Sequence, residues 1–324
     1  MDLKDKRIYI AGSTGMVGRA IVRALEGRGC GRLITKTSAE LDLISQAEVE
    51  EFFTSERPEI VILSAAKVGG IHANDTLRAE FLYNNLMIEA NVIHAAHQAG
   101  VEKLIFMGSS CIYPRMAQQP MREEALLTGP LEQTNEPYAI AKIAGLKMCE
   151  SYYRQYGSNF YSVMPTNLFG PNDNFDLNSS HVIPALIRKV HSAKMENLPE
   201  VVVWGTGKPF REFMYVDDAA DAVLFLLENI DAADLNNDGV SHVNIGCGKD
   251  VSILELVEII KEVVGYNGSI RFDTSMPDGT PKKLLDASRL SKLGWNYRTS
   301  LVDGLRKTYD WFLSSRQTES SVAK

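Results

Sequence analysis

A tyrosine and a lysine in the segment 135–146 have types and a spacing that could do acid–base chemistry. Tyr138 and Lys142 are four positions apart, so on a helix they lie one turn apart on the same face. Pro137 suits the first turn of that helix, where its missing N–H costs little. A phenol beside an ammonium loses its proton more readily, because the positive charge favours the phenolate. The pair could exchange a proton with a carbonyl group that is being reduced, although an isolated pair of this kind is usually a surface feature.

A serine and a cysteine follow a predicted strand at residues 103–108. If the chain stays extended beyond Gly108, Ser109 and Cys111 point to the same side. A serine hydroxyl can hydrogen-bond the carbonyl oxygen that the tyrosine protonates. Considered alone, Cys111 is interpreted as a buried small residue, which is the common state of a free cysteine.

The first elements of the chain predict a dinucleotide site. A short buried strand at residues 7–11 leads into Gly12, Gly15 and Gly18, and an amphipathic helix then runs to about Gly27. Glycines at such a turn let the backbone approach a pyrophosphate, which meets the N–H groups at the N-terminus of the helix. The spacing alone is weak, but its place between a strand and a helix favours nucleotide binding.

The second strand, residues 32–35, bears on the choice of cofactor. It is followed by Lys36, where chains that bind NAD usually offer an acidic residue to the ribose hydroxyls. A lysine there tolerates a 2′-phosphate and favours NADP, or else it is a solvated surface residue. The carboxylate of Asp42, next to Leu43, could meet the adenine amino group.

The alternation of elements predicts an α/β protein, a Rossmann-type doubly wound parallel sheet with a smaller C-terminal α/β substrate lobe. We expect residues 1–170 to form the NADP-binding lobe, with a return segment at about 214–245, and residues 171–213 and 246–324 to form mainly the substrate lobe. Further expected strands are residues 59–64, 160–164, 201–204 and 243–246, and expected helices are 77–99, one through Tyr138 to 156, one from 216, 253–264 and 301–313. Residues 165–171 are expected to be a turn, 230–239 and 277–283 loops, and the polar tail after 313 frayed.

Composition narrows the classes of function. The chain has 324 residues, of which 45% are hydrophobic and 23% charged, and its net charge of -7 argues against nucleic-acid binding. No apolar run is long enough to span a bilayer, and no signal segment is expected at the start. The four cysteines lack metal-ligand spacing, so we expect no metal site and a cytoplasmic location. His94 and His97 are expected to serve packing or a helix interface.

Several segments together carry a family resemblance. The chain resembles the extended short-chain dehydrogenase/reductases of the sugar-nucleotide branch, and within them the GDP-L-fucose synthase family, over nearly its whole length. The segments that carry the resemblance are Ala65-Ala-Lys-Val-Gly-Gly70, Gly108-Ser-Ser-Cys-Ile-Tyr-Pro114, Asn135-Glu-Pro-Tyr-Ala-Ile-Ala-Lys-Ile-Ala-Gly145, Met164-Pro-Thr-Asn-Leu-Phe-Gly-Pro171, Ser180-His-Val-Ile-Pro-Ala185, Val201-Val-Val-Trp-Gly205, Arg211-Glu-Phe213 and Pro277-Asp-Gly-Thr-Pro-Lys-Lys-Leu-Leu-Asp286.

The resemblance implies a reaction and roles for five residues. GDP-4-keto-6-deoxy-D-mannose would be epimerised at C3 and C5 and then reduced at C4 by NADPH, giving GDP-L-fucose. Ser109, Tyr138 and Lys142 match the reducing trio, and Lys142 would also hold the nicotinamide ribose. Cys111 matches the base of the epimerisations, which needs neighbouring positive charge to lower its thiol pKa. His181 matches the acid that returns the proton, and a pKa near neutrality suits that task.

The resemblance also implies the binding residues and a homodimer. Arg211 and Lys283 would meet the phosphates or the sugar of the substrate, and Trp204 the guanine. Lys189 stands beside Arg188, where the family often has arginine, so the charge is kept but the bidentate fork is lost. The predicted substrate contacts are Ser109, Cys111, Asn167, His181, Arg188, Lys189, Trp204, Arg211 and Lys283. The predicted cofactor contacts are Gly12, Ser13, Thr14, Gly15, Met16, Val17, Gly18, Lys36, Asp42, Leu43, Ala65, Ala66, Lys67, Tyr138, Lys142, Pro165, Asn167, Leu168 and His181.

The chain departs from the family at the cofactor end, and two alternatives follow. Relatives commonly have a His-Arg pair at Ser13-Thr14 and an arginine near Ser38, so the preference for NADPH rests mainly on Lys36. One alternative is a sugar-nucleotide epimerase or dehydratase that keeps a tightly bound NAD. The other is a dinucleotide-binding protein without activity. Cys111 with His181 argues against the first, and the intact reducing trio against the second.

Overall fold

The computed structural model describes residues 1–177, 179–236, 239–276 and 278–322, and all of their side chains except those of residues 71, 72 and 317–322. The strands are β1 Ile8–Ala11, β2 Leu33–Thr35, β3 Ile60–Leu63, β4 Lys103–Met107, β5 Phe160–Pro165, β6 Asn167–Phe169, β7 Glu200–Trp204, β8 Phe210–Tyr215, β9 His242–Ile245, β10 Asp250–Ser252, β11 Ser269–Asp273 and β12 Lys282–Lys283. The α-helices are α1 Met16–Gly27, α2 Gln46–Glu56, α3 Ile71–Thr76, α4 Arg78–Gln98, α5 Glu136–Tyr156, α6 Val182–Met195, α7 Val216–Asn229, α8 Ala232–Asn236, α9 Ile253–Val264, α10 Ser288–Lys292 and α11 Leu301–Val322. Two short 3₁₀ helices are η1 Ser110–Ile112 and η2 Glu123–Ala125.

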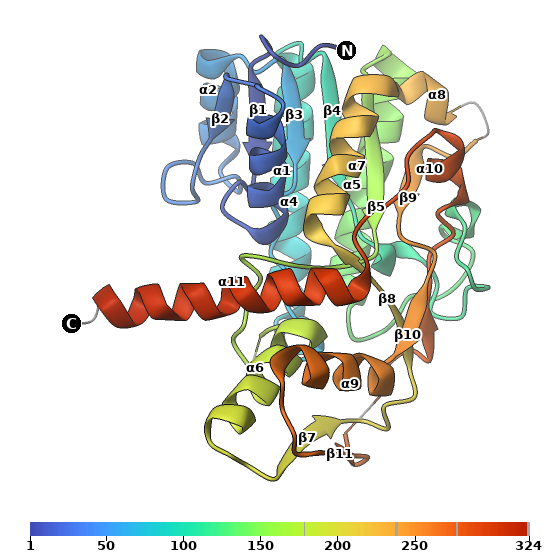
Figure 1. Cartoon of the computed structure of the whole chain (residues 1–324). Coiled ribbons are helices and arrows are strands. Elements are labelled where there is room, and N and C mark those ends of the chain that lie inside the picture. Colours follow the sequence, from blue (N-terminus) through green and yellow to red (C-terminus); the bar gives the residue numbers. More distant parts are fainter. Residues whose placement is uncertain (178, 237–238, 277, 323–324) are drawn as a thin grey trace.

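A parallel sheet of six strands, in the order β2-β1-β3-β4-β5-β9, forms the larger part of the molecule (Figure 1). Alternate side chains of its strands enter two different cores. Ile8 and Ile10 pack under α1 and α7, whereas Tyr9 and Ala11 pack under α2 and α4. This alternation follows from the period of two in a strand, so the sheet is covered by helices on both faces. The predicted Rossmann-type class is confirmed.

The smaller part is built around α6, α9, β7 and β11, which lie together in Figure 1 below the parallel sheet. Its core contains Ile187 and Val190 of α6 with Leu256 and Ile260 of α9. Strand β8 connects this part to the rest, because it pairs with β6, β10 and β12. In Figure 1, α11 lies between the two parts and extends beyond them on one side.

Most predicted elements are present, but four predictions were wrong. The expected turn at 165–171 contains β6, whose Asn167 pairs with Phe213 of β8. The expected loop at 230–239 contains α8, because Ala232 and Leu235 are buried in the core; residues 237–238 lie outside the described residues. The expected loop at 277–283 ends in β12, whose Lys283 pairs with Arg211; residue 277 also lies outside the described residues. Finally, the helix expected to end near 313 continues to Val322.

The two histidines of α4 contact residues in the last turns of α5 and just beyond its C-terminal end. His94 Nδ1 lies 2.7 Å from the hydroxyl of Tyr152, and His97 Nδ1 lies 3.0 Å from Ser158 Oγ. The His97 ring also stacks on Tyr156. Among the described residues, no group of three or more His, Cys, Asp or Glu side chains is arranged to hold a metal ion. No helix in the described part of the chain has the length and apolarity to cross a membrane.

Candidate active site

The first glycine turn lies at the point where the strand order of the sheet reverses. β1 has β2 on one side and β3 on the other, and ligands of such sheets bind at the carboxyl ends of strands at this point. Gly12 has φ +84°, and a Cβ there would lie 2.6 Å from the backbone nitrogen of Ala65. Gly18 packs the helix onto the turn, since its Cβ would lie 2.1 Å from the Gly12 carbonyl oxygen. The fold therefore brings the predicted turn and the predicted segment after β3 together.

The space in front of α1 fits a pyrophosphate. A Cβ on Gly15 would meet its nearest neighbour at 3.6 Å, and Gly15 caps α1 without any side-chain hydrogen bond. Backbone N–H groups at the start of α1 are thus open to an anion. Ser13 is buried, Thr14 is exposed, and Met16 and Val17 pack partly against the core. These residues fit the phosphates of NADP.

The predicted adenosine end of the cofactor site offers one weakly held cation. Lys36 Nζ lies 3.8 Å from Glu56 Oε1, a long contact that leaves the ammonium available. Asp42 Oδ1 accepts the Ile44 N–H at 3.0 Å, and the Leu43 carbonyl accepts Asn91 Nδ2 at 3.0 Å. The backbone after β2 is therefore fixed while Lys36 is not.

The segment after β3 is held by an asparagine that sequence reasoning missed. Lys67 donates its backbone N–H to Asn85 Oδ1 at 2.8 Å, and Asn85 Nδ2 donates to the Lys67 carbonyl at 3.0 Å. The Lys67 ammonium forms an ion pair with Glu80. Ala65 and Ala66 are half-buried beside this clamp.

Tyr138 and Lys142 occupy one face of α5, next to the end of β4. The helix begins with Pro137 in its first turn and ends at Gly157, which adopts φ +73°. Lys142 Nζ lies 5.7 Å from the centre of the Tyr138 ring and donates to the Met107 carbonyl at 3.1 Å. The same ammonium lies 3.0 Å from Oε1 of Glu89, a buried carboxylate of α4. Lys142 therefore has a counter-ion, which the sequence-based argument about Tyr138 did not include.

The path of the chain after Gly108 differs from the prediction. Ser109 is extended, but Ser110–Ile112 form η1, so the expected extended arrangement of Ser109 and Cys111 was wrong. The short helix brings the two residues together differently, because the backbone N–H of Cys111 donates to Ser109 Oγ at 3.3 Å. Ser109 Oγ acts as the cap of this helix.

Burial reverses two expected pKa shifts. Burial raises the pKa of the Cys111 thiol, and the charges of Lys283 and Lys142 and a hydrogen bond with Ser109 offset only part of the rise. Burial also raises the pKa of Tyr138 well above its ordinary value, Cys111 and Glu89 add to the rise, and a hydrogen bond with Ser109 opposes it. The expectation that neighbouring cations would lower both values was wrong for this structure. The raised pKa keeps Tyr138 protonated at neutral pH, as a proton donor requires.

Lys283 is the cation with the largest influence on Cys111. Burial lowers the pKa of Lys283, Cys111 and Glu132 raise it, and Arg211 lowers it further. Arg211 is aligned with Lys283 across β8 and β12, and burial lowers its pKa too. Glu132, which sequence reasoning missed, also receives a hydrogen bond from Thr280 Oγ1 at 3.2 Å. Cys111, Lys283 and Arg211 are therefore electrostatic neighbours.

His181 stands at the start of α6, and the loop just before it contacts the segment after β3 in the larger part of the molecule. It is the N-cap residue of α6, with φ −75° and ψ 172°, and its side chain makes no capping bond. The Gly70 N–H donates to the Ser179 carbonyl at 3.0 Å, and a Cβ on Gly70 would lie 2.8 Å from the Ser180 carbonyl oxygen. His181 is exposed to solvent on one side, but the protein around it desolvates the imidazole, and this burial lowers its pKa. The expected near-neutral pKa is thus shifted downward.

Trp204 was predicted for the guanine side of the site, and Lys189, predicted with Arg188 as a phosphate contact, lies beside it. Lys189 Nζ lies 5.0 Å from the Trp204 ring, which is 58% exposed, and burial lowers the pKa of Lys189. Arg188 instead donates to the Phe175 carbonyl at 2.9 Å. An exposed indole face beside a cation suits a stacked base.

Pro165, Asn167 and Leu168 line the junction of β5 and β6. Pro165 is paired with Ile245 at the end of β5, and Leu168 packs partly against the core under α7. Asn167 Nδ2 donates to the Glu212 carbonyl at 2.8 Å. The junction therefore lies at the carboxyl end of the parallel sheet, where a nicotinamide is expected.

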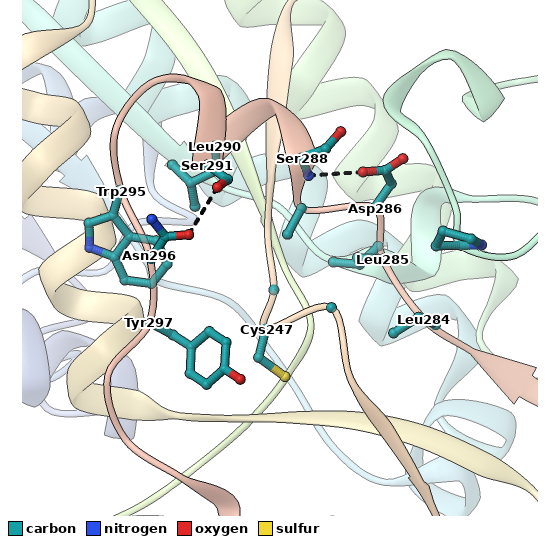
Figure 2. Close-up of a pocket in the computed structure, with 14 residues that line it drawn as sticks. Cys247, Leu284, Leu285, Asp286, Ser288, Leu290, Ser291, Trp295, Asn296 and Tyr297 are labelled. Carbon is teal, nitrogen blue, oxygen red and sulfur yellow. Dashed lines mark hydrogen bonds between the residues drawn. The ribbon is translucent and has the colours of Figure 1, made fainter.

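A cavity of about 310 Å³ lies apart from the predicted catalytic residues, between the end of β9 and the segment around α10. Figure 2 shows Cys247 and Tyr297 at its wall, with Leu284, Leu285 and Asp286 on another side. Hydrogen bonds join Asp286 with Ser288, and Ser291 with Asn296. None of the predicted catalytic residues lines this cavity.

Comparison with known proteins places the chain in a family. A profile of the NAD dependent epimerase/dehydratase family matches residues 8–246. The chain belongs to this family. The matched region begins at β1 and ends just after β9, so it spans the six-stranded parallel sheet.

Within the epimerase/dehydratase family, relatives with named activities match almost the whole chain. GDP-L-fucose synthase 1 of Arabidopsis thaliana is 56% identical over 97% of this chain and 95% of its own. GDP-L-fucose synthase of Escherichia coli K12 is 56% identical over 97% of this chain and 98% of its own. A solved GDP-D-glycero-L-gluco-heptose synthase of Campylobacter jejuni, in the presence of NADPH, is 40% identical, covers 97% of this chain and 100% of its own, and superposes with a TM-score of 0.91. The resemblance to the GDP-L-fucose synthases is confirmed.

Proposed function

We propose that this protein converts GDP-4-keto-6-deoxy-D-mannose to GDP-L-fucose by epimerising C3 and C5 and then reducing the C4 ketone with NADPH. The observation that carries the proposal is the thiol of Cys111 beside Ser109 and Tyr138. Reduction alone needs no thiol there, whereas epimerisation next to a ketone needs a base. The GDP-L-fucose synthases that are 56% identical to the chain support the same substrate and product.

Epimerisation uses the acidity of hydrogens next to the C4 ketone. The Cys111 thiolate removes the proton from C3 or C5, the C–H electron pair forms an enolate, and a proton returns to the opposite face from His181. The enolate oxygen is stabilised by the Ser109 hydroxyl and the Tyr138 phenol. Lys283 and Lys142 supply the positive charge that the thiolate needs within its buried site.

Reduction uses the same ketone after both centres are inverted. NADPH, when bound, supplies a hydride to C4. Tyr138 gives its proton to the oxygen at C4, so the carbonyl becomes an alcohol and charge is balanced. Ser109 hydrogen-bonds the same oxygen, and the Lys142 ammonium holds the nicotinamide ribose close to Tyr138.

The GDP group is proposed to lie across the smaller part of the molecule. Arg211 and Lys283 provide two neighbouring cations for the pyrophosphate, and Lys189 and Trp204 receive the guanine. Residues 1–170 and 214–245 then form the cofactor lobe, and residues 171–213 and 246–324 form mainly the substrate lobe. The separate sheets of the two parts support this division.

We further propose a homodimer and a cytoplasmic location. Large apolar side chains stay exposed on the packed helices α4 and α5, among them Tyr83 at 59% and Ile140 at 44%. A second copy placed on these helices would cover them. All four cysteines are free thiols, as expected in a reducing compartment. Sedimentation of the protein and of Ile140→Glu tests the dimer, which the charged variant should weaken.

The proposed function is tested by following nicotinamide absorbance with GDP-4-keto-6-deoxy-D-mannose, with NADPH and NADH in parallel. We expect rapid oxidation of NADPH and an equal amount of GDP-L-fucose, identified by nuclear magnetic resonance. A protein that purifies with bound NAD and oxidises neither added cofactor would instead be an epimerase or dehydratase. Nucleotide binding without any turnover would also refute the proposal.

A further inference from the structure

A glutamate that the mechanism above does not use lies against Lys142. Glu89 belongs to the buried stripe of α4, one turn after Asn85 and two turns after Phe81. Its side chain and that of Lys142 are 1% and 2% exposed, and Oε1 lies 3.0 Å from Nζ. The contact joins the two long helices that Figure 1 shows in the larger part of the molecule.

The surroundings are shaped to admit this carboxylate. Gly145 lies opposite on α5, and a Cβ there would come within 2.7 Å of Glu89 Oε2 and 2.5 Å of Phe106 Cζ. The Phe106 ring also faces Lys142 Nζ, whose distance to the ring centre is 4.6 Å. A side chain at position 145 would therefore displace either the carboxylate or the ring that borders the ammonium.

Stability alone gives no reason for an ion pair in this place. Removing two charges from water is costly, and well-packed apolar side chains in place of a buried ion pair are often as stable or more stable. Apolar and small side chains such as Val92, Ala96 and Leu146 pack around the pair between α4 and α5. A carboxylate that contacts the catalytic ammonium thus points to a role in catalysis.

We propose that Glu89 is a positioning residue for the reduction: its carboxylate fixes the Lys142 ammonium beside Tyr138 and balances its charge inside the helix interface. This inference rests on the proposed function. The ammonium donates one hydrogen bond to the Met107 carbonyl and forms an ion pair with Glu89 Oε1, which leaves N–H donors for the cofactor. The position of the ammonium is therefore set by Glu89 together with the Met107 carbonyl.

The titratable groups around the pair decide the direction of the pH effect. Tyr138 and Cys149 face it from α5 and Cys111 from η1, while β4 contributes the Phe106 ring and the Met107 carbonyl. Loss of the negative Glu89 neighbour lowers the pKa of Tyr138, for which Glu89 is one cause of the rise. The protonated phenol that reduction needs is then lost at a lower pH, so the alkaline limb of reduction moves to lower pH.

The test compares Glu89→Gln with Glu150→Gln. Glu150 is a suitable control because it is a glutamate of α5 that is 9% exposed and bonded to Lys147 and Ser241, away from the reducing trio. Two rates are measured against pH: NADPH oxidation, and deuterium uptake at C3 and C5 of the GDP-sugar in heavy water. We expect Glu89→Gln to lose about tenfold or more in reduction, with its alkaline limb at lower pH, while uptake stays within about twofold of wild type. Glu150→Gln should leave both rates unchanged.

Two results would overturn the inference. One is a Glu89→Gln enzyme that reduces at the wild-type rate with an unshifted limb. The other is an equal fall of uptake and reduction, which indicates a purely structural role. If Glu89→Gln does not fold, Glu89→Asp replaces it: a partial shift of the limb supports the inference, and an unshifted limb overturns it. Failure of the proposed function is distinguishable, because it would appear as absent turnover in the wild-type protein.

Discussion

Replacing Lys283 by methionine should slow epimerisation, because Lys283 is the main charge that offsets the burial of Cys111. Burial raises the pKa of Cys111 and lowers that of His181 from ordinary values of about 8.5 and about 6.5. The base is then mostly protonated and the acid mostly neutral at the same pH. Because the two pKa values are moved apart in this sense, only a small fraction of the free enzyme carries thiolate and imidazolium together.

This reversed arrangement fixes the shape of the pH profile. As pH rises, the thiolate fraction grows by the factor by which the imidazolium fraction shrinks, so their product stays constant between the two pKa values. We expect kcat/KM for deuterium uptake at C3 and C5 to be flat between the lowered pKa of His181 and the raised pKa of Cys111, and to fall only outside that range. Each unit by which Lys283→Met raises the Cys111 pKa lowers that plateau about tenfold and moves the alkaline limb upward.

Lys282→Met is the matched control. Lys282 is the neighbour of Lys283 in β12, but it is exposed and pairs with Asp250 at 3.0 Å. Uptake is measured by nuclear magnetic resonance in heavy water, at saturating GDP-sugar as well as under kcat/KM conditions, so that weaker substrate binding is separated from slower proton removal. An unchanged plateau in Lys283→Met, or an equal loss in Lys282→Met, would refute the assignment of Lys283 to Cys111.

Two further predictions concern the loop before α6 and the cofactor. Gly70→Ala places a Cβ 2.8 Å from the Ser180 carbonyl oxygen, so the loop that carries His181 must move, and we expect about a tenfold loss of deuterium uptake. Gly27→Ala is the control, because its Cβ meets nothing within 4 Å and should have no effect. Equal behaviour of the two variants would contradict the placement of His181. Lys36→Glu should lower the preference for NADPH over NADH, measured as the ratio of kcat/KM values, by about tenfold or more, because the 2′-phosphate loses a charged partner; an unchanged ratio would show that Lys36 does not contact the phosphate.

The sequence predicted the framework of the site well, because its main features are local. The glycine turn between β1 and α1, and the helix that carries Tyr138 and Lys142, follow from spacing, proline and glycine within a few residues. The doubly wound sheet follows from the regular alternation of buried strands and long helices. Such patterns are readable without tertiary contacts.

The wrong predictions depend on contacts between distant segments. β6 and β12 are recognisable only because both pair with β8, and neither short segment has a strand pattern of its own. The pKa shifts of Cys111 and Tyr138 were predicted from nearby cations, but burial, which the sequence does not show, dominates both. Glu89 did carry a signal in the sequence, because it stands eight residues after Phe81 and three before Val92, a helical spacing that predicts a buried position on α4.

The proposed function requires one cluster of side chains to hold both a base for epimerisation and an acid for reduction. It is tested most directly by analysing the products of Cys111→Ser and Tyr138→Phe, each with GDP-4-keto-6-deoxy-D-mannose and NADPH in heavy water. We predict that Cys111→Ser takes up no deuterium at C3 or C5 and forms no GDP-L-fucose, while Tyr138→Phe still takes up deuterium but reduces slowly. Formation of GDP-L-fucose by Cys111→Ser at a near-normal rate would contradict the account.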